Sequence, residues 1–211
     1  MTGLLVIVIA YLIGGIPFGY VLVRLTTGKD IRTAGSGNIG ATNVLRTTGR
    51  ATAVVTLILD IVKGFAAVWL AAELTGQDSM WTSMAALAVM AGHAFPVFLK
   101  FKGGKAVASF IGAFLYLTPV PLLAVVVVFF ITVAVTRHIS AGSILAAATF
   151  PLGVWIILHP PPAVFLASLI AGVFIVYRHK SNIERLRSGT ENVFTWSSAG
   201  GGDSHLLGRR R

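Results

Sequence analysis

Phosphate-binding chemistry is concentrated in three polar segments of an otherwise apolar sequence. The first segment, residues 34–46, contains Gly35, Ser36, Gly37, Asn38, Gly40, Thr42, Asn43 and Arg46. Glycines let a backbone turn with positive φ and approach a ligand closely. Hydroxyls and amides donate hydrogen bonds, and a guanidinium fits two phosphate oxygens at once. We interpret this segment as an anion-binding loop; the alternative is a flexible loop that ends at a helix cap.

The second segment places two lysines around a pair of glycines. Lys102 and Lys105 flank Gly103 and Gly104 at the start of a predicted helix. Helix amino termini carry partial positive charge and free N–H groups, so anions bind there. An ordinary turn at the membrane surface, with two snorkelling lysines, is the alternative interpretation.

The third segment, residues 178–186, follows the last apolar run. If it is helical, His179 and Asn182 lie three residues apart on one face. Glu191 comes shortly afterwards and could hold the segment in place through an ion pair. A basic helix that lies on the lipid surface has the same pattern and stays the alternative.

The composition is that of a protein embedded in lipid. Of its 211 residues, 55% are hydrophobic and 11% are charged, against about 25% charged in a soluble globular domain. So few charges cannot cover a water-soluble body. Long apolar runs such as residues 122–135 must satisfy their backbone hydrogen bonds internally, as helices. The predicted fold is an all-α polytopic membrane protein.

We predict about seven transmembrane helices. Their ranges are 4–24, 51–72, 80–99, 106–118, 120–136, 142–158 and 163–177. The fourth is short, and Pro119 and Pro121 bound it, so the fourth and fifth could instead form a broken or re-entrant pair. Seven crossings, or five with such a pair, both stay open.

Charge indicates that the two ends of the chain lie on opposite sides of the membrane. All 17 lysines and arginines except Lys63 fall in segments that seven crossings put on one side, which the positive-inside rule identifies as the cytoplasm. The amino terminus is therefore expected outside and the carboxyl terminus in the cytoplasm. Residues 1–192 would form one integral-membrane domain, and residues 193–211 are expected to be a disordered tail.

Three ionisable residues fall inside predicted helices. Asp60 and Lys63 lie three residues apart, and we expect them to pair within the bundle because isolated charges are costly there; a direct role with substrate is the alternative. His93 is expected to be buried and hydrogen-bonded to a carbonyl. The chain has no cysteine and no cluster of acids, so neither a metal nor another cofactor is expected.

Taken together, the polar segments resemble the motifs of a known family. Residues 36–43 followed by Arg46, residues 92–98 leading into 102–105, and residues 178–191 are similar to the three motifs of the bacterial acyl-phosphate:glycerol-3-phosphate acyltransferases of the PlsY family. The likeness extends to about residue 192. One position departs from it: Ala106 stands where the family usually has glycine. Alanine suits a helical start there but not a left-handed turn.

The resemblance implies transfer of a fatty acyl group from acyl phosphate to the 1-hydroxyl of sn-glycerol 3-phosphate, which gives lysophosphatidic acid and phosphate. An upstream acyl-phosphate-forming enzyme would supply the donor, membrane lipids would surround the protein, and no nucleic acid would take part. The protein would lie in the bacterial inner membrane with its site facing the cytoplasm. Because acyl phosphate is already activated, no covalent intermediate is needed. The base would be the donor's phosphate or His179.

The expected site draws on all three segments. Its catalytic residues would be Ser36, Arg46, Lys105, His179 and Asn182. Its substrate- and phosphate-binding residues would be Gly37, Asn38, Thr42, Asn43, Lys102, Gly103, Gly104, Ser143 and Arg185. Supporting residues would be Asp60, Lys63, His93 and Glu191.

An anion transporter or channel is the main alternative, because it too would place cations around a membrane site. Transport requires access from both sides, and transporters usually contain broken helices at midplane from related halves. This chain shows no internal repeat, and its phosphate-type residues fall on one side. Phosphate uptake into vesicles, compared with lysophosphatidate formation, distinguishes the two classes.

Overall fold

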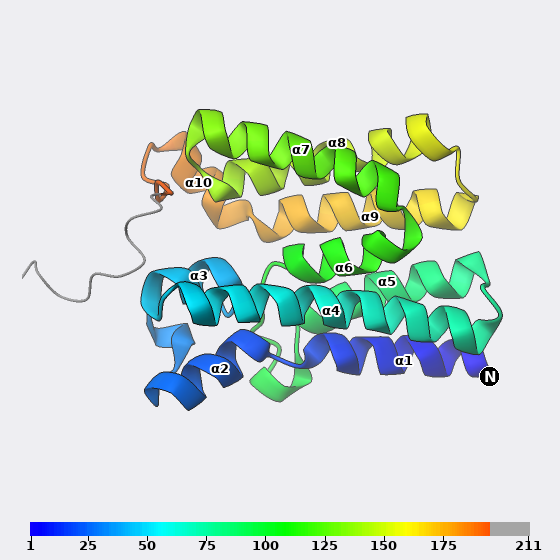
Figure 1. Ribbon diagram of the computed structural model, residues 1–211, viewed down its shortest axis with the longest axis horizontal. Coiled ribbons are helices and arrows are strands. Elements are labelled where there is room, and N and C mark those ends of the chain that lie inside the picture. Colours follow the sequence, from blue (N-terminus) through cyan, green and yellow to red (C-terminus); the bar gives the residue numbers. More distant parts are fainter. Residues whose placement is uncertain (195–211) are drawn as a thin grey trace, which may run out of the picture.

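The computed structural model describes residues 1–194, and over that range the protein is built from helices and their connections (Figure 1). The α-helices are α1 (Thr2–Gly15), α2 (Phe18–Thr27), α3 (Ala41–Thr47), α4 (Arg50–Thr75), α5 (Ser79–Ala94), α6 (Val107–Leu117), α7 (Pro119–Thr136), α8 (Ile139–Leu158), α9 (Pro162–Arg178) and α10 (Lys180–Arg187). Two short 3-10 helices, η1 (Ile31–Thr33) and η2 (Val97–Leu99), lie in the loops before α3 and α6.

Most of the predicted tail, residues 195–211, lies outside the described residues. Its first two residues are described. The N–H of Phe194 donates to the carbonyl of Arg137 over 2.7 Å, which connects this residue to the end of α7. The domain boundary at residue 192 stays a prediction.

Each predicted span corresponds to one helix or, for the first span, to α1 and α2 together, but not every helix is long enough to cross a bilayer. Five segments in the described range have the length and composition of spans, or six if α9 and α10, which meet at 55°, count as one. α6 has 11 residues and is about 17 Å long at 1.5 Å per residue, against a hydrocarbon core of about 30 Å. The protein is thus a multi-pass helical membrane protein. Seven crossings and the sides of the termini stay predictions.

The first predicted span is interrupted between α1 and α2, at Ile16 and Pro17. Proline has no N–H to continue the helical ladder, so a break there frees backbone groups. The Ile16 carbonyl accepts a hydrogen bond from the Lys63 ammonium over 2.8 Å. A polar backbone group that lipid could not satisfy is therefore satisfied from α4.

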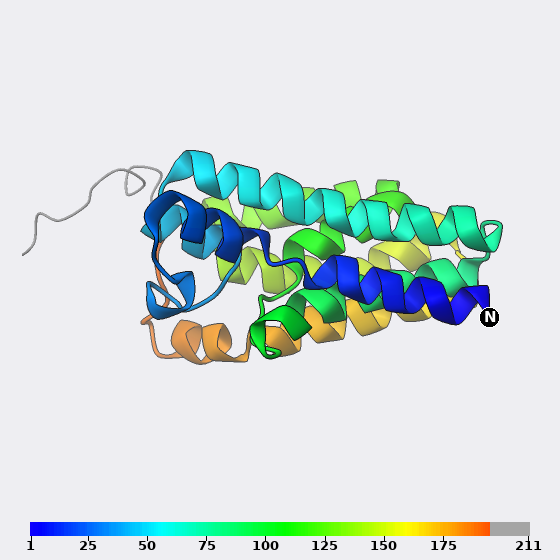
Figure 2. The same cartoon turned by 90° about the horizontal axis from the view of Figure 1, so that it is seen from below.

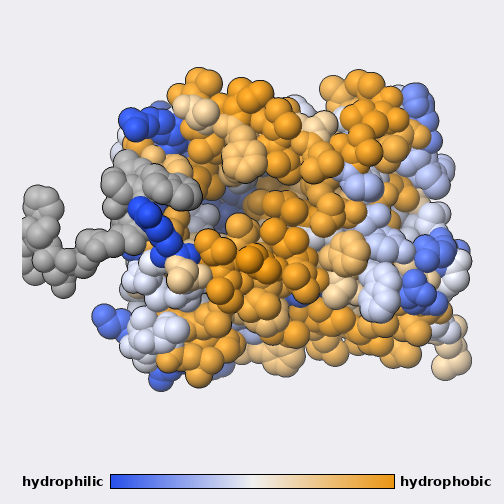
Figure 3. Space-filling model, in the orientation of Figure 1, coloured by the Kyte–Doolittle hydropathy of each residue, from blue (hydrophilic) through white to orange (hydrophobic). Residues whose placement is uncertain are grey.

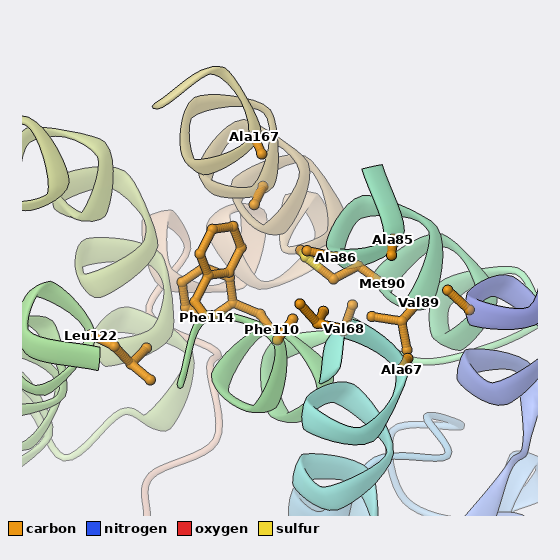
Figure 4. Packing of buried hydrophobic residues seen from close by; sticks show 14 of the residues in the cluster. Ala67, Val68, Ala85, Ala86, Val89, Met90, Phe110, Phe114, Leu122 and Ala167 are labelled. Atoms are coloured by element: carbon orange, nitrogen blue, oxygen red, sulfur yellow. The ribbon is translucent and has the colours of Figure 1, made fainter. Parts of the chain in front are cut away.

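The core lies between α4, α5, α6, α8 and α9. Phe110 and Phe114 of α6 each pack edge-on against Phe150 of α8, with ring centroids 4.8 Å apart. Figure 4 shows the two α6 rings near Val68 and Met90, which come from α4 and α5. Although α6 is short, it therefore packs against α4 and α5 on one side and against α8 on the other.

Because α6 is short, it occupies only part of the length of the bundle between α9 and α4 (Figure 1). It fills the part of the bundle nearer the amino terminus, and no helix continues it toward α3 and α10 (Figure 1). The protein surface is apolar over most of this face (Figure 3). It is hollowed between α7 on one side and α4 on the other, and hydrophilic residues lie at the bottom of the hollow. A lipid-facing opening thus leads to polar residues inside the bundle.

Candidate functional site

The polar segments gather at the end of the bundle opposite the amino terminus, which we call the site end. Figures 1 and 2 both place α2, α3 and α10 there. The first contact between distant segments is made by Lys105, which precedes α6. Its ammonium donates to the side-chain oxygen of Asn182 on α10. The predicted convergence of the second and third segments is therefore present.

Glu191 organises the third segment. Its Oε1 accepts hydrogen bonds from Asn182 Nδ2 at 2.8 Å and from Ser140 Oγ at 2.9 Å. Its Oε2 accepts from Arg185 Nε at 2.7 Å. Burial alone would raise the pKa of Glu191, but these hydrogen bonds outweigh it and hold the pKa below its usual value. The carboxylate is therefore ionised and fixes three side chains, including the amide that contacts Lys105.

Lys105 lies in a strongly cationic environment. Partial burial, with a further contribution from nearby arginines, lowers its pKa to about 8, while Glu191 acts in the opposite direction. Those arginines are Arg185, Arg46 and Arg178. Because these cations repel one another, an anion bound between them would be stabilised by all of them.

The first segment forms a loop, residues 34–40, that we call the Ser36 loop. Asn43, at the start of α3, is buried and holds it from inside. Its Oδ1 accepts the backbone N–H of Ser36 at 2.8 Å, and its Nδ2 donates to the carbonyls of Asn38 at 2.8 Å and Ala34 at 3.0 Å. Both polar atoms of the Asn43 side chain are thus hydrogen-bonded to backbone groups. These bonds give Asn43 a role in shaping the loop, and its binding of substrate stays a prediction.

Two glycines of the Ser36 loop have the backbone that the sequence suggested, and the third does not. Gly35 has φ +57°, and a Cβ there would lie 2.2 Å from Asn43 Oδ1. Gly37 has φ +70°. Gly40 has φ −78° and instead caps α3, while its N–H donates to Asn38 Oδ1 at 2.8 Å. Asn38 therefore closes the turn through its side-chain oxygen.

The Ser36 and Thr42 hydroxyls, which we expected to bind phosphate, make no hydrogen bond within the described part of the chain. Ser36 is exposed, and its hydroxyl makes no hydrogen bond to any described residue. Thr42 is half-buried, and the same holds for its hydroxyl within residues 1–194. Arg46 follows in the last turn of α3; partial burial lowers its pKa, and Glu191 and Arg185 act on it in opposite directions. These three side chains retain hydrogen-bonding capacity for a ligand.

The glycine loop, residues 102–106, is hydrogen-bonded to the end of α5. The N–H of Gly103 donates to the Ala94 carbonyl at 3.2 Å, and that of Gly104 donates to the His93 carbonyl at 3.1 Å. A Cβ at Gly104 would lie 2.2 Å from His93 Nε2. The two glycines allow the loop to pack tightly on the end of α5. Their N–H groups are not available to bind a phosphate.

Because the glycines bond back to α5, Lys105 lies level with the last turn of that helix and not beyond it. Lys102, by contrast, is exposed on the outside of the loop. Ala106 is left-handed, with φ +62°, in place of the helical start expected for alanine. It is the last residue of the loop and the N-cap of α6, so the strained residue directly follows Lys105.

The remaining predicted residues are divided between the site and its surroundings. His179 is buried between α9 and α10, and its Nδ1 lies 2.7 Å from the Ile175 carbonyl, so Nδ1 donates and Nε2 keeps its lone pair. Ser143 donates to the Ile139 carbonyl of its own helix at 3.0 Å. Its neighbour Ser140 makes the contact with Glu191, which the sequence did not reveal.

Asp60, Lys63 and His93 form a buried cluster beside the glycine loop. Lys63 pairs with Asp60 at 2.7 Å, and His93 Nδ1 lies 3.6 Å from the same carboxylate oxygen. The expected pair is therefore present and supports the α1–α2 break and the loop packed on His93. Within residues 1–194, no three His, Asp or Glu side chains lie close enough to hold a metal ion.

Comparisons with known proteins show the family to which the chain is similar. Residues 4–189 match the family model described as glycerol-3-phosphate acyltransferase. A glycerol-3-phosphate acyltransferase of Desulforamulus reducens is 47% identical over 90% of this chain and 94% of its own, and one of Geobacter sulfurreducens is 46% identical over 92% and 98%.

Two solved structures have the same fold. They are crystal structures of PlsY (YgiH), an integral membrane glycerol 3-phosphate acyltransferase, in its glycerol 3-phosphate form and its lysophosphatidic acid form. Their TM-scores are 0.87 and 0.85, with 37% and 35% sequence identity, and each match covers 92% of this chain and 96% of the solved chain. The chain therefore belongs to the glycerol-3-phosphate acyltransferase family of integral membrane proteins.

Proposed function

We propose that the protein transfers a fatty acyl group from acyl phosphate to the 1-hydroxyl of sn-glycerol 3-phosphate, and releases lysophosphatidic acid and phosphate. The observation that carries the proposal is the contact of Lys105 with Asn182, which brings the second and third polar segments together within reach of Arg46. A cluster of several cations around a single buried carboxylate suits a reaction in which both substrates are phosphorylated.

The hollow between the α4 and α7 halves supports a lipid donor. Acyl phosphate has an apolar tail and a doubly charged head, so its site must adjoin both hydrocarbon and cations. The space left by the short α6 opens an apolar face onto hydrophilic residues (Figure 3). A tail lying in this opening would bring the acyl carbonyl to the residues around Lys105.

The mechanism follows from the leaving group. The glycerol hydroxyl oxygen attacks the acyl carbonyl carbon, the bond from that carbon to the phosphate oxygen breaks, and the hydroxyl proton passes to the departing phosphate, which leaves as hydrogen phosphate. Ser36, Arg46 and Lys105 would hold the phosphates and stabilise the charge that develops. Neither a covalent enzyme intermediate nor a cofactor takes part in these steps.

The donor's own phosphate is the proposed base. His179 is the alternative, because its Nε2 keeps a lone pair while Nδ1 donates to Ile175. His179 is buried, however, and its Nδ1 donates to a backbone carbonyl in place of the carboxylate that usually stabilises an imidazolium. We assign Nε2 the role of accepting a hydrogen bond from a substrate hydroxyl, which orients the nucleophile.

The proposed site faces the cytoplasm from the bacterial inner membrane. The exposed cations of the site end support this orientation, and an upstream acyl-phosphate-forming enzyme would deliver the donor on that side. The reaction would be the first acylation in phospholipid synthesis. Glycerol 3-phosphate and acyl phosphate would then enter from different phases and meet at Lys105.

A donor comparison on purified protein tests the proposal. Lysophosphatidic acid formation is measured with acyl phosphate, acyl-CoA and acyl-carrier protein in turn, each with glycerol 3-phosphate. We expect product with acyl phosphate alone, and one phosphate released per lysophosphatidic acid. Formation from acyl-CoA but not from acyl phosphate would overturn the assignment of the donor.

A further inference from the structure

Arg178, the last residue of α9, connects the third polar segment to the glycine loop. Its Nη2 donates to the Gly104 carbonyl at 2.8 Å and lies 3.4 Å from the Gly103 carbonyl. These carbonyls directly precede Lys105. The side chain is half-buried and joins parts of the chain 74 residues apart. It was not among the residues the sequence analysis placed in the site.

Phe95 provides a platform for the same guanidinium. The Arg178 guanidinium carbon lies 4.9 Å from the centre of the Phe95 ring, which is a cation–π arrangement. The ring is itself held edge-on by Phe174 of α9 at 6.1 Å, and the Phe95 carbonyl accepts the Tyr11 hydroxyl at 2.7 Å. Side chains from α1 and α9 therefore fix the platform.

The glycine loop and the two residues before it require external support because their backbone is strained. Lys100, Phe101 and Ala106 have φ of 54°, 61° and 62°, a region that residues other than glycine rarely adopt. Such conformations persist only where surrounding contacts determine them. The Arg178 Nε is buried and has no hydrogen-bond partner within the described residues, so the anchoring depends on Nη2 and on the stacked plane.

We propose that Arg178 is a positioning residue for glycerol 3-phosphate binding, which anchors the glycine loop so that Lys105 contacts the substrate phosphate while His179 accepts a hydrogen bond from the substrate hydroxyl. Lys105 directly follows the anchored carbonyl of Gly104, and His179 directly follows the anchor itself. A single guanidinium thereby sets the relative position of two polar groups, one in the glycine loop and one at the junction of α9 and α10. The inference rests on the proposed role of Lys105.

An enzyme series separates positioning from simple structural support. The variants are Arg178→Gln, Arg178→Lys, Phe95→Leu and the double variant Arg178→Gln/Phe95→Leu, with Arg187→Gln on the exposed face of α10 as the matched control. kcat and KM for glycerol 3-phosphate are measured with whichever acyl donor the wild type uses, so failure of the proposed donor does not affect the result. Lys105→Met is included to test the role of Lys105 directly.

We expect Arg178→Gln to lower kcat/KM for glycerol 3-phosphate about 10- to 100-fold, mostly through a higher KM. Phe95→Leu should act in the same direction by about 3- to 10-fold, and Arg178→Lys, which keeps the charge but not the planar fork, should fall between the wild type and Arg178→Gln. The double variant should be no worse than Arg178→Gln, because both changes remove one clamp. Arg187→Gln should match the wild type.

A purely structural role would lower the folded fraction, and hence the maximal rate, at unchanged KM. That result, or additive effects in the double variant, would overturn the proposal. If Arg178→Gln does not fold, the KM values of Arg178→Lys and Phe95→Leu decide in the same way. If Lys105→Met retains the wild-type KM, the role of Lys105 fails and this inference fails with it, whichever donor is used.

Discussion

Lys105 donates a hydrogen bond to the side-chain oxygen of Asn182, 77 residues away in the sequence. The other half of the Asn182 amide donates to Glu191 at 2.8 Å. A cation on one side and a carboxylate on the other permit only one orientation of the amide. Asn182 therefore carries the influence of Glu191 to Lys105, and so fixes the ammonium before any substrate arrives.

Asn182→Asp would break this relay. It replaces an amide donor by a carboxylate that faces the carboxylate of Glu191, and like charges at this distance repel. We expect kcat/KM for glycerol 3-phosphate to fall about 100-fold, as for loss of a preorganised hydrogen-bonding group. Asn192→Asp, at an exposed position with the same chemistry, should keep wild-type activity. Equal activity of both variants would contradict the relay.

The pH dependence of substrate binding should report Lys105. Its pKa is lowered from its ordinary value to about 8. The Lys105 side chain therefore carries its positive charge below that pH and loses it as the pH rises through that value. A bound phosphate favours the charged form, so KM for glycerol 3-phosphate should increase with pH above about 8. Initial rates from about pH 6.5 to 9.5 measure this increase.

Lys105→Arg provides the control for that profile. Because a guanidinium stays charged over the whole range, the alkaline rise in KM should disappear even if the variant is slower overall. The same alkaline rise in Lys105→Arg and in the wild type would assign the titration to another group.

The helices could be predicted from the sequence because lipid imposes a simple rule on them. Every predicted span corresponds to one helix or, for the first span, to a pair of helices, since an apolar run in hydrocarbon must bond internally. Hydropathy did not reveal how much of the bilayer each helix crosses. α6 is short because the left-handed Ala106 and the Thr118–Pro119 turn bound it, and these are local backbone events within a continuous apolar region.

The sequence predicted which residues lie at the candidate site better than it predicted their hydrogen-bond partners. Residue types located Lys105, Asn182 and Arg185 correctly near one another, because phosphate chemistry selects cations and amides. They did not show that Asn43 and the glycine pair would hydrogen-bond to backbone carbonyls, since that depends on which carbonyls the folded chain brings near. Ser140 carried no sequence signal beyond a serine at the start of a span.

Ala106→Gly should stabilise the protein. Alanine in a left-handed conformation costs about 1 kcal/mol relative to glycine, and φ at Ala106 is +62°. We expect the unfolding midpoint in detergent to rise by about 2–4 °C, as about 1 kcal/mol gives in a chain of this size. Ala113→Gly, in the middle of α6, should lower it. A lower midpoint for Ala106→Gly would mean that the methyl group's packing outweighs the strain.

Lys63 should matter for folding more than for chemistry. Lys63→Met leaves the Asp60 carboxylate without its ion pair and the Ile16 carbonyl without its donor, and breaking a buried pair costs about 3–5 kcal/mol. We expect a large fall in the unfolding midpoint and partial recovery in Asp60→Asn/Lys63→Met. The activity of each variant, expressed per folded molecule, should stay within about threefold of wild type. A selective loss of kcat would instead support a direct role with substrate.

The orientation in the membrane can be tested directly because the chain has no cysteine. Single variants Arg187→Cys on α10 and Glu73→Cys near the end of α4 place thiols at exposed positions at opposite ends of the bundle. If the site end faces the cytoplasm, a membrane-impermeant maleimide added to intact spheroplasts should label Glu73→Cys only. Permeabilised cells should show labelling of both, which controls for thiol reactivity. Labelling of Arg187→Cys from outside would place the cation cluster on the wrong side for glycerol 3-phosphate made in the cytoplasm, and the positive-inside argument would fail with it.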